Sequence, residues 1–253
     1  MSTVGAAALD DVGRDAYRDG MSDPSWAQGR IALVTGATSG FGEAMARRLI
    51  AGGARVIATG RRQARLDALV ADLRTDRLLP RVLDVTDAAQ VAGFAETLPG
   101  DFAAIDILYN NAGLALGLGR AHEADLADWE TMIATNVTGL ARVTRAILPG
   151  MVARNRGDVL NLSSVAASYP YPGGNVYGAT KAFVRQFSLN LRADLLGTKV
   201  RVTSIEPGMA ETEFSVVRFK GDEGAAGKVY AGVHAMSADD IALVCESVLR
   251  LPA

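Results

Sequence analysis

The 253-residue chain is predicted to fold as one α/β domain, a doubly wound parallel sheet with helices on both faces. From residue 30 onward, short β-branched or apolar runs alternate with longer segments whose apolar residues recur at helical spacing. Parallel neighbouring strands need a right-handed crossover, which the intervening helices supply. Hydrophobic residues make up 49% of the chain, which is enough to bury a sizeable core at this length.

Six strands are expected after residue 30, separated by helices. The predicted strands span residues 31–35, 55–59, 81–84, 105–109, 159–162 and 200–205. The predicted helices span residues 41–51, 62–74, 87–97, 126–149 and 175–196, with a last helix near 238–250. Residues 1–29 hold few large apolar side chains, so we expect a mobile leader before a single domain at 30–253.

Composition excludes several classes of function. The net charge of -2 gives no basic field for nucleic acid or for an anionic membrane surface, and no segment reaches the ~20 apolar residues that span a bilayer. One cysteine cannot form an internal disulfide, and two scattered histidines give no metal-ligand spacing. We therefore expect a cytoplasmic protein that binds small molecules and holds no metal.

A glycine-rich turn follows the first predicted strand and leads directly into a helix. Its glycines allow a tight turn and let backbone N–H groups approach a pyrophosphate at the start of the helix. A plain glycine-rich turn is the alternative, but the strand–loop–helix context favours a dinucleotide site. The candidate cofactor residues here are Gly36, Thr38, Ser39, Gly40, Phe41 and Gly42.

Two arginines, Arg61 and Arg62, follow the second predicted strand, where an NAD-specific enzyme is expected to place an acidic residue for the ribose 2′-hydroxyl. Guanidinium groups instead suit a 2′-phosphate, because arginine binds phosphate in a planar fork. The alternative is that both arginines are a solvated start to the next helix. The pair favours NADP(H) as the cofactor.

Polar and small residues also follow the later strands, at the edge of the sheet where ligands bind. A carboxylate at Asp84 suits the adenine amino group or a turn cap, and Asn-Asn-Ala-Gly at 110–113 suits a sharp backbone turn beneath a cofactor or an ordinary turn. In the long helix that follows, Asn136 predicts a kink or a bound water. The candidates that come directly after strands are Asp84, Val85, Asn110, Ala112, Gly113, Ser163, Ser164, Pro207, Gly208 and Thr212.

The predicted helix at 175–196 carries the candidate acid/base. Tyr177 and Lys181 are one turn apart, so the ammonium and the phenol cover the same patch of helix surface. Such a pair alone is weak evidence. Phe183, Phe187, Leu191 and Leu195 recur every fourth residue and form an apolar stripe that should face other protein.

Together, the ordered motifs TGxxxGxG, NNAG, Asn136, Ser164, YxxxK and PG resemble the short-chain dehydrogenase/reductases, over about residues 30–253. The resemblance implies a Rossmann-type fold and a catalytic set of Asn136, Ser164, Tyr177 and Lys181. It implies that Tyr177 exchanges a proton with the substrate oxygen, that Ser164 stabilises this oxygen, and that Asn136 anchors a water near Lys181. Lys181 and the nicotinamide are expected to lower the pKa of the phenol.

The segments 110–117, 173–188 and 217–222 are similar to the NADP-dependent 3-hydroxy acid dehydrogenases, which include serine 3-dehydrogenase, allo-threonine dehydrogenase and malonic semialdehyde reductase. This similarity implies a small 3-hydroxy or 3-oxo acid as substrate. The loop after Gly208 should form a lid, and we expect its Arg218 to pair with the substrate carboxylate. A homotetramer is implied as well.

Two departures from the family pattern bear on these expectations. The lid segment PGMAET is one residue shorter than in the subgroup, and the usual seventh strand after the last helix is not apparent. Either further residues follow in the protein or the sheet edge is left unpaired. A reductase of another small acidic aldehyde, such as sulfoacetaldehyde, is the alternative enzyme. A non-catalytic NADP-binding subunit is the alternative from another class.

Overall fold

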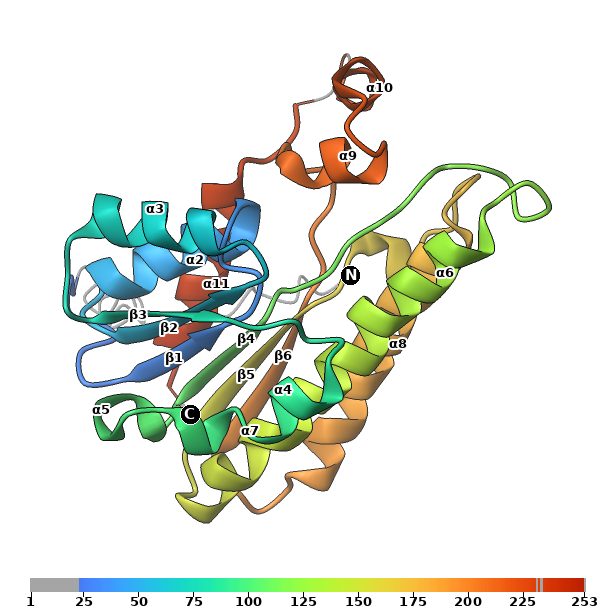
Figure 1. The fold of residues 1–253 in the computed structure, drawn as a ribbon. Coiled ribbons are helices and arrows are strands. Elements are labelled where there is room, and N and C mark those ends of the chain that lie inside the picture. The colour runs from blue at the N-terminus through green and yellow to red at the C-terminus, as the bar shows by residue number, and fades with distance from the viewer. Residues whose placement is uncertain (1–22, 231, 233, 253) are drawn as a thin grey trace, which may run out of the picture.

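The computed structural model describes residues 23–230, 232 and 234–252 and contains the expected parallel sheet (Figure 1). Its strands lie in the order β3-β2-β1-β4-β5-β6. They are β1 (Ile31–Val34), β2 (Arg55–Gly60), β3 (Leu78–Val82), β4 (Ile107–Asn110), β5 (Gly157–Leu162) and β6 (Val200–Ile205). The winding direction reverses between β1 and β4. This confirms the doubly wound fold and places a ligand crevice beyond the carboxyl ends of these two strands.

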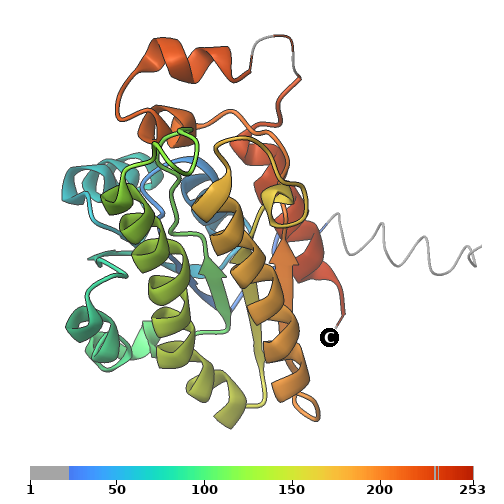
Figure 2. The same cartoon turned by 90° about the vertical axis from the view of Figure 1, so that its right-hand side faces the viewer.

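Helices cover both faces of the sheet (Figure 1). One layer consists of α2 (Gly40–Ala51), α3 (Gln63–Leu73) and α11 (Ala238–Arg250). The other layer consists of α4 (Ala88–Ala92), α5 (Gly100–Ala103), α6 (Leu126–Ile133), α7 (Leu140–Ala153) and α8 (Asn175–Asp194). Figure 2 shows α8 running beside the long α6–α7 rod. Two short helices, α9 (Glu213–Arg218) and α10 (Glu223–Lys228), lie beyond the carboxyl edge of the sheet, and we call them the lid.

The alternation of strand side chains builds two cores, one on each face. Leu33, Ile57 and Leu108 point into the core beneath α7 and α8, whereas their neighbours Val34 and Val56 point into the core beneath α2 and α11. All five side chains are fully buried. Because both faces are covered, the strands are continuous apolar runs, as is usual for parallel sheets.

The third strand begins earlier than predicted. It spans Leu78–Val82 rather than residues 81–84, and it includes Pro80. Pro80 pairs with Ala58 on β2, and among the described strands none lies on the other side of β3. An edge strand tolerates proline because the missing N–H is needed only on a paired side.

Two predicted helices are divided. The helix predicted at 87–97 ends at Ala92 and is followed by a 3₁₀ turn at Ala95–Thr97. The helix predicted at 126–149 continues to residue 153, but the segment Ala134–Gly139 forms a π-helical turn between α6 and α7. Asn136 lies in this turn, which departs from regular α-helix at the residue where the sequence predicts a kink or a bound water.

The packed domain starts a few residues before the predicted boundary at residue 30. Ala27 is fully buried in the core beneath α2, and its N–H donates to the carbonyl of Gly52 at 2.8 Å. The Trp26 ring stacks against the guanidinium of Arg250, with 5.2 Å from Cζ to the ring centroid. The predicted leader is thus packed from Trp26 onward, and residues 1–22 lie outside the described residues.

Among the described residues, no strand pairs with the outer edge of β6, as the sequence led us to expect. α11 instead packs against α2, and Leu251 after it is about half exposed. The described helices include none with the length and apolar character needed to cross a bilayer.

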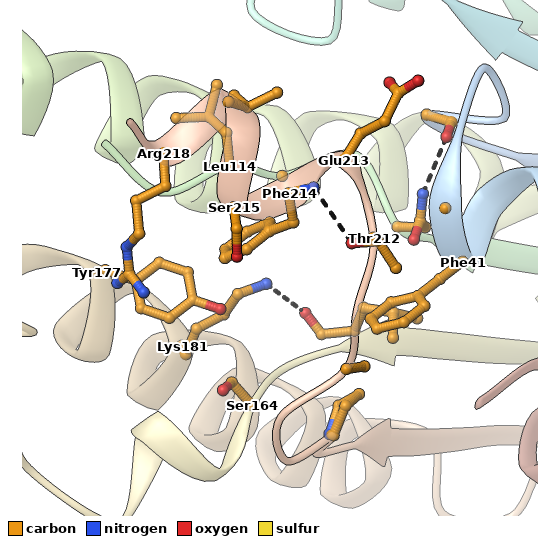
Figure 3. Close-up of a pocket in the computed structure, with 18 of the residues that line it drawn as sticks. Phe41, Leu114, Ser164, Tyr177, Lys181, Thr212, Glu213, Phe214, Ser215 and Arg218 are labelled. Carbon is orange, nitrogen blue, oxygen red and sulfur yellow. Dashed lines mark hydrogen bonds between the residues drawn. The ribbon is translucent and has the colours of Figure 1, made fainter. Parts of the chain in front are cut away.

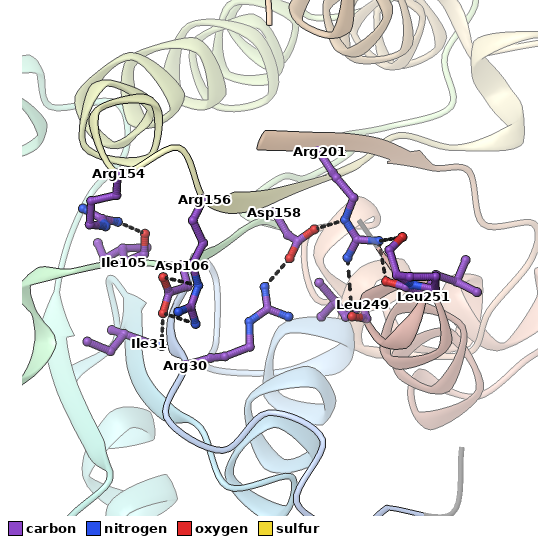
Figure 4. Close-up of polar contacts among 11 residues, drawn as sticks. Arg30, Ile31, Ile105, Asp106, Arg154, Arg156, Asp158, Arg201, Leu249 and Leu251 are labelled. Atoms are coloured by element: carbon purple, nitrogen blue, oxygen red, sulfur yellow. Dashed lines mark hydrogen bonds and ion pairs between the residues drawn. The ribbon is translucent and has the colours of Figure 1, made fainter. Parts of the chain in front are cut away.

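Charged side chains clamp the amino edge of the sheet, opposite the ligand crevice (Figure 4). The carboxylate of Asp158 on β5 is 9% exposed and pairs with both Arg30, before β1, and Arg201 on β6. Arg201 also donates to the carbonyl of Leu251 at 2.7 Å. Asp158 therefore joins the start of the sheet to its last strand and to the end of α11.

Asp158→Asn is expected to lower the free energy of unfolding by about 3 kcal/mol, because two part-buried guanidinium groups lose their charged partner. Urea denaturation measures this loss. The control is Asp72→Asn, which removes the exposed ion pair with Arg47 and should cost less than about 1 kcal/mol. Equal losses in the two variants would contradict a structural role for the Asp158 clamp.

Candidate active site

A cavity of about 840 Å³ lies at the carboxyl ends of the strands, between the loops that follow them and the lid. Figure 3 shows side chains from α8, from the glycine-rich turn and from α9 directed into it. Most residues predicted to form the site line this cavity. They are Gly36, Thr38, Ser39, Gly40, Phe41, Arg61, Arg62, Asp84, Val85, Ala112, Gly113, Ser164, Tyr177, Lys181, Pro207, Gly208, Thr212 and Arg218.

The glycine-rich turn has the backbone that its sequence demands. Gly36 and Gly40 have φ angles of 67° and 54°, a region that side-chain-bearing residues rarely adopt. Asn111 holds the turn from β4, because its Nδ2 donates to the carbonyl oxygens of Thr35 and Gly36 at 2.9 and 3.1 Å. The side chain of Ser39 does not cap α2, so the first N–H groups of this 12-residue helix face the cavity. This cradle fits a pyrophosphate.

Gly42 and Asn110 were predicted to bind cofactor, but neither lines the cavity. A Cβ on Gly42 would lie 2.2 Å from the carbonyl oxygen of Gly36, so this glycine lets α2 begin close to the turn. Asn110 is 3% exposed and donates from Nδ2 to Thr144 and Asn161, each at 2.9 Å. Both residues support the loops around the cavity from outside it, and their direct contact with a cofactor stays a prediction.

The end of β2 presents both arginines to the cavity, as predicted. Arg62 donates from Nη2 to the hydroxyl groups of Thr38 and Ser39, each at 3.0 Å. Arg61 has no polar side-chain partner within the described part of the chain. Asp84 uses Oδ1 to accept from the N–H and hydroxyl of Thr86 at 2.9 and 2.7 Å. Asp84 therefore caps a turn, as one of its two predicted roles requires, and it also lines the cavity. Its contact with the adenine amino group stays a prediction.

The first turns of α8 bring Tyr177 and Lys181 to the centre of the cavity, with Ser164 beside them (Figure 3). Tyr177 and Lys181 are 8% and 7% exposed. The ammonium donates to the carbonyl of Leu162 at 2.8 Å and lies 5.8 Å from the centroid of the Tyr177 ring. Ser163 also lines the cavity, but its buried hydroxyl donates to the Lys181 carbonyl at 2.7 Å. Ser164, and not Ser163, is the serine that meets the phenol.

Burial raises the pKa of Tyr177 to about 12, although its hydrogen bond to Ser164 and the charge of Arg218 act in the opposite direction. The expectation that Lys181 lowers the pKa of Tyr177 is wrong, because the ammonium donates to the Leu162 carbonyl rather than to the phenol oxygen. The expected effect of the nicotinamide stays a prediction. The phenol is therefore protonated at neutral pH. This state suits a group that donates a proton.

Burial also lowers the pKa of Lys181 to about 8. This value is below the ordinary 10.5, so the folded state disfavours the charged form. The penalty is fully present below pH 8 and disappears as pH rises from 8 to 10.5, where only the unfolded state stays protonated.

Lys181→Met should therefore be more stable than the native protein, by up to about 3 kcal/mol, below pH 8. The gain should shrink toward pH 10.5. Denaturant midpoints across this range measure the difference, and a pH-independent difference would contradict burial of the charge.

Asn136 does not line the cavity, and its predicted role of anchoring a water near Lys181 stays a prediction. Its Oδ1 accepts from the N–H of Leu114 at 2.9 Å, and its Nδ2 donates to the Leu114 carbonyl at 2.8 Å and to Thr180 at 3.1 Å. The side chain is 2% exposed, and all of these partners are protein groups. The π-helical turn thus presents the amide so that it ties the loop after β4 to α8 behind Lys181.

Several residues that were not predicted from the sequence also line the cavity, and they come from segments that are far apart in the chain. Tyr171 accepts a hydrogen bond from Arg218 Nη2 at 2.6 Å, and Phe214 tilts against the Tyr177 ring at 5.7 Å. The hydroxyl of Ser215 on α9 lies 2.6 Å from that of Tyr230, in the turn after α10. The sequence Tyr-Pro-Tyr-Pro at 169–172 could have indicated that Tyr171 lines the site, because it comes a few residues after the candidate Ser164.

A family model for the short chain dehydrogenases matches residues 30–222. The chain belongs to the short-chain dehydrogenase family. The NADP-dependent 3-hydroxy acid dehydrogenase YdfG of Escherichia coli (strain K12) is 58% identical to it, covering 88% of this chain and 90% of the relative. Serine 3-dehydrogenase of Agrobacterium fabrum is 55% identical, covering 83% of this chain and 84% of the relative.

Solved structures of short-chain dehydrogenases share the fold. The closed form of a serine dehydrogenase complexed with NADP+ has a TM-score of 0.86 at 57% identity, covering 88% of this chain and 90% of that one. The serine dehydrogenase from Escherichia coli has a TM-score of 0.76 at 52% identity, covering 88% and 92%. The cavity described above lies where this family is expected to bind its dinucleotide.

Proposed function

We propose that this short-chain dehydrogenase transfers a hydride between NADP(H) and the 3-position of a small 3-hydroxy or 3-oxo acid. Family membership and NADP-dependent relatives make the chain an NADP-dependent enzyme that acts on a hydroxyl group. The two arginines at the end of β2 agree with that cofactor.

One observation carries the proposal for the substrate. The guanidinium of Arg218 lies 5.1 Å from the centroid of the Tyr177 ring, so a fixed cation stands beside the candidate acid/base. Its Nε is buried and has no hydrogen-bond partner among the described residues. A carboxylate is the natural partner for such a donor, because it accepts from guanidinium in a planar fork. A small acid bound there places its 3-oxygen near Tyr177 and its carboxylate on Arg218.

The reaction needs a proton and a hydride. The nicotinamide of NADP(H) supplies or accepts the hydride. Tyr177 donates the proton to the substrate oxygen during reduction and takes it back during oxidation, and Ser164 donates a hydrogen bond to the same oxygen. Lys181 keeps positive charge below this centre, held by the carbonyl of Leu162. The raised pKa of Tyr177 favours the proton-donating role.

Aromatic side chains surround the proposed carboxylate site and fix the cation. Arg218 Cζ lies 5.7 Å from the centroid of the Tyr171 ring and 5.8 Å from that of Phe214. The backbone N–H of Gly117 donates to the Arg218 carbonyl at 2.9 Å, which anchors the end of α9. The guanidinium is therefore held in one orientation, as recognition of a planar acid requires.

A substrate panel tests this proposal. NADPH oxidation should proceed with malonic semialdehyde, and NADP+ reduction should proceed with 3-hydroxypropionate and serine. The value of kcat/KM for malonic semialdehyde should exceed that for sulfoacetaldehyde, whose sulfonate also matches the guanidinium. A higher value for sulfoacetaldehyde would assign the enzyme to that aldehyde, and no turnover of any of them would support a non-catalytic NADP-binding subunit.

Arg218→Ala is expected to raise KM for a 3-hydroxy acid about 10- to 100-fold, because the substrate carboxylate loses a charge-assisted hydrogen bond. The matched control is Lys220→Ala, which removes a cation from the turn between α9 and α10, where its Nζ pairs with Asp128 at 2.9 Å. Its effect on KM should be much smaller. An unchanged KM in Arg218→Ala would remove this residue from the substrate site.

We also propose that the protein assembles as a homotetramer. The predicted stripe on α8 is only partly covered within one chain, because Leu191 and Leu195 are buried but Phe183 is 37% exposed. The Phe183 and Phe187 rings stack at 5.5 Å, and Ile133 on α6 is 44% exposed. These apolar side chains support association through the α6 and α8 surface, as the family resemblance implies. Sedimentation velocity gives the oligomeric state directly.

A further inference from the structure

The first residue of the lid helix α9, Glu213, reaches across to α3 at the start of the cofactor cavity. Its Oε1 lies 2.9 Å from Arg65 Nη2, and its Oε2 lies 3.3 Å from Arg62 Nη1. Figure 3 shows Glu213 and Arg218 at opposite ends of α9. The helix that carries the proposed substrate cation is therefore fastened at its other end to arginines beside the proposed 2′-phosphate site.

The contacts of Glu213 continue into the glycine-rich turn. Arg62 is bound to the hydroxyl groups of Thr38 and Ser39, so the lid, α3 and the pyrophosphate cradle form one connected set. The lid also passes close to this turn, since a Cβ on Gly40 would lie 3.4 Å from the Cβ of Thr212. A cofactor in the cavity would run beneath this bridge.

We propose that Glu213 is a positioning residue, which holds α9 through Arg62 and Arg65 so that Phe214 and Arg218 stand over Tyr177. The inference rests on the proposed function, because it assigns to Glu213 the placement of the substrate cation. Through Arg62 it also couples the phosphate end of the cofactor to the substrate end of the cavity.

The charge of the Glu213 carboxylate allows a positioning role to be distinguished from a general contribution to folding stability. A 2′-phosphate and the Glu213 carboxylate are both anions that use Arg62, whereas Arg65 does not line the cavity and serves the lid alone. Removing the carboxylate therefore frees Arg62 for the phosphate while it releases the lid. Cofactor affinity and substrate affinity should change in opposite directions, which loss of folding stability would not produce.

The first test follows the lid without turnover, using trypsin on the full chain saturated with NADP+. Lys220 lies in the turn between α9 and α10, so release of the lid should expose its peptide bond. In Glu213→Gln, cleavage after Lys220 should be about 5- to 10-fold faster, a difference that 0.5 M salt should abolish by screening the ion pairs. Cleavage after the exposed Lys199 reports global unfolding and should not change.

A double-mutant cycle identifies the partner. Arg65→Gln should accelerate cleavage less than Glu213→Gln, because the pair between Arg62 and Glu213 remains, and the double variant should cleave no faster than Glu213→Gln alone. The control is Asp67→Asn, which removes the charge of a carboxylate on α3 that accepts from Gln63, and it should leave cleavage unchanged. Additive effects, or equal acceleration at Lys199, would overturn the proposal.

Steady-state and binding measurements complete the test. Glu213→Gln should raise KM for the acid substrate about 3- to 10-fold with kcat within about twofold, while NADP+ in the absence of substrate binds as tightly or more tightly. Weaker binding of NADP+ together with a raised KM would overturn the proposal. Failure of the substrate panel with intact trypsin results would instead reject the proposed function and keep the positioning role.

Discussion

Replacing Tyr177 with phenylalanine is expected to lower kcat by about 10²- to 10⁴-fold, the contribution of a positioned general acid/base. The substitution removes one oxygen atom from a side chain that is 8% exposed and packs against Phe214. The ring, its aromatic contact and the cavity shape are kept. NADP+ binding and the denaturant midpoint should therefore remain close to those of the native protein.

The matched control for this substitution is Tyr169→Phe, which removes the hydroxyl of a tyrosine that is 72% exposed. Its kcat should be unchanged. Single-turnover reduction by NADPH separates chemistry from product release and should show the full loss in Tyr177→Phe. Residual activity above about 10% of the native value would assign proton transfer to another group, and a comparable loss in Tyr169→Phe would point to a general disturbance of the loop.

Arg61→Ala is expected to weaken the preference for NADPH over NADH, lowering kcat/KM with NADPH about 10- to 100-fold while leaving kcat/KM with NADH nearly unchanged. The reason is that Arg61 lines the cavity and has no protein acceptor among the described residues, so its guanidinium is available to a 2′-phosphate. NADH serves as an internal control because it lacks that phosphate. Equal losses with the two cofactors would show that Arg61 supports the fold rather than the phosphate.

The fold and most of the cavity were predictable because both depend on local patterns. Alternating strands and helices fix the parallel sheet, and parallel strands send all their carboxyl ends to one edge. Motifs as far apart in sequence as Gly36 and Pro207 therefore meet in one cavity. The spacing of Tyr177 and Lys181 on one helix needed no tertiary information.

The features that were not predicted have a different cause. A local sequence pattern does not show which neighbour a side chain contacts in the folded chain. Asn110 and Asn111 are adjacent and chemically identical, yet one points beneath the sheet edge and the other holds the glycine-rich turn. The pKa of Tyr177 depends on burial by the lid and the loop after β4, which a pair of residues on α8 cannot reveal. Glu213 and Tyr171 acquire partners only through contacts between segments that are far apart in sequence.

The Asp158 clamp has a consequence for how this enzyme can change. The ion pairs of Asp158 lie at the amino edge of the sheet, whereas the residues that line the cavity lie on loops and lid helices at the carboxyl edge. The contacts that stabilise the sheet are therefore separated from the residues that line the cavity. Variation confined to residues 209–218 can alter the accepted acid while the clamp keeps the scaffold folded, so this segment is the place to begin a directed-evolution library.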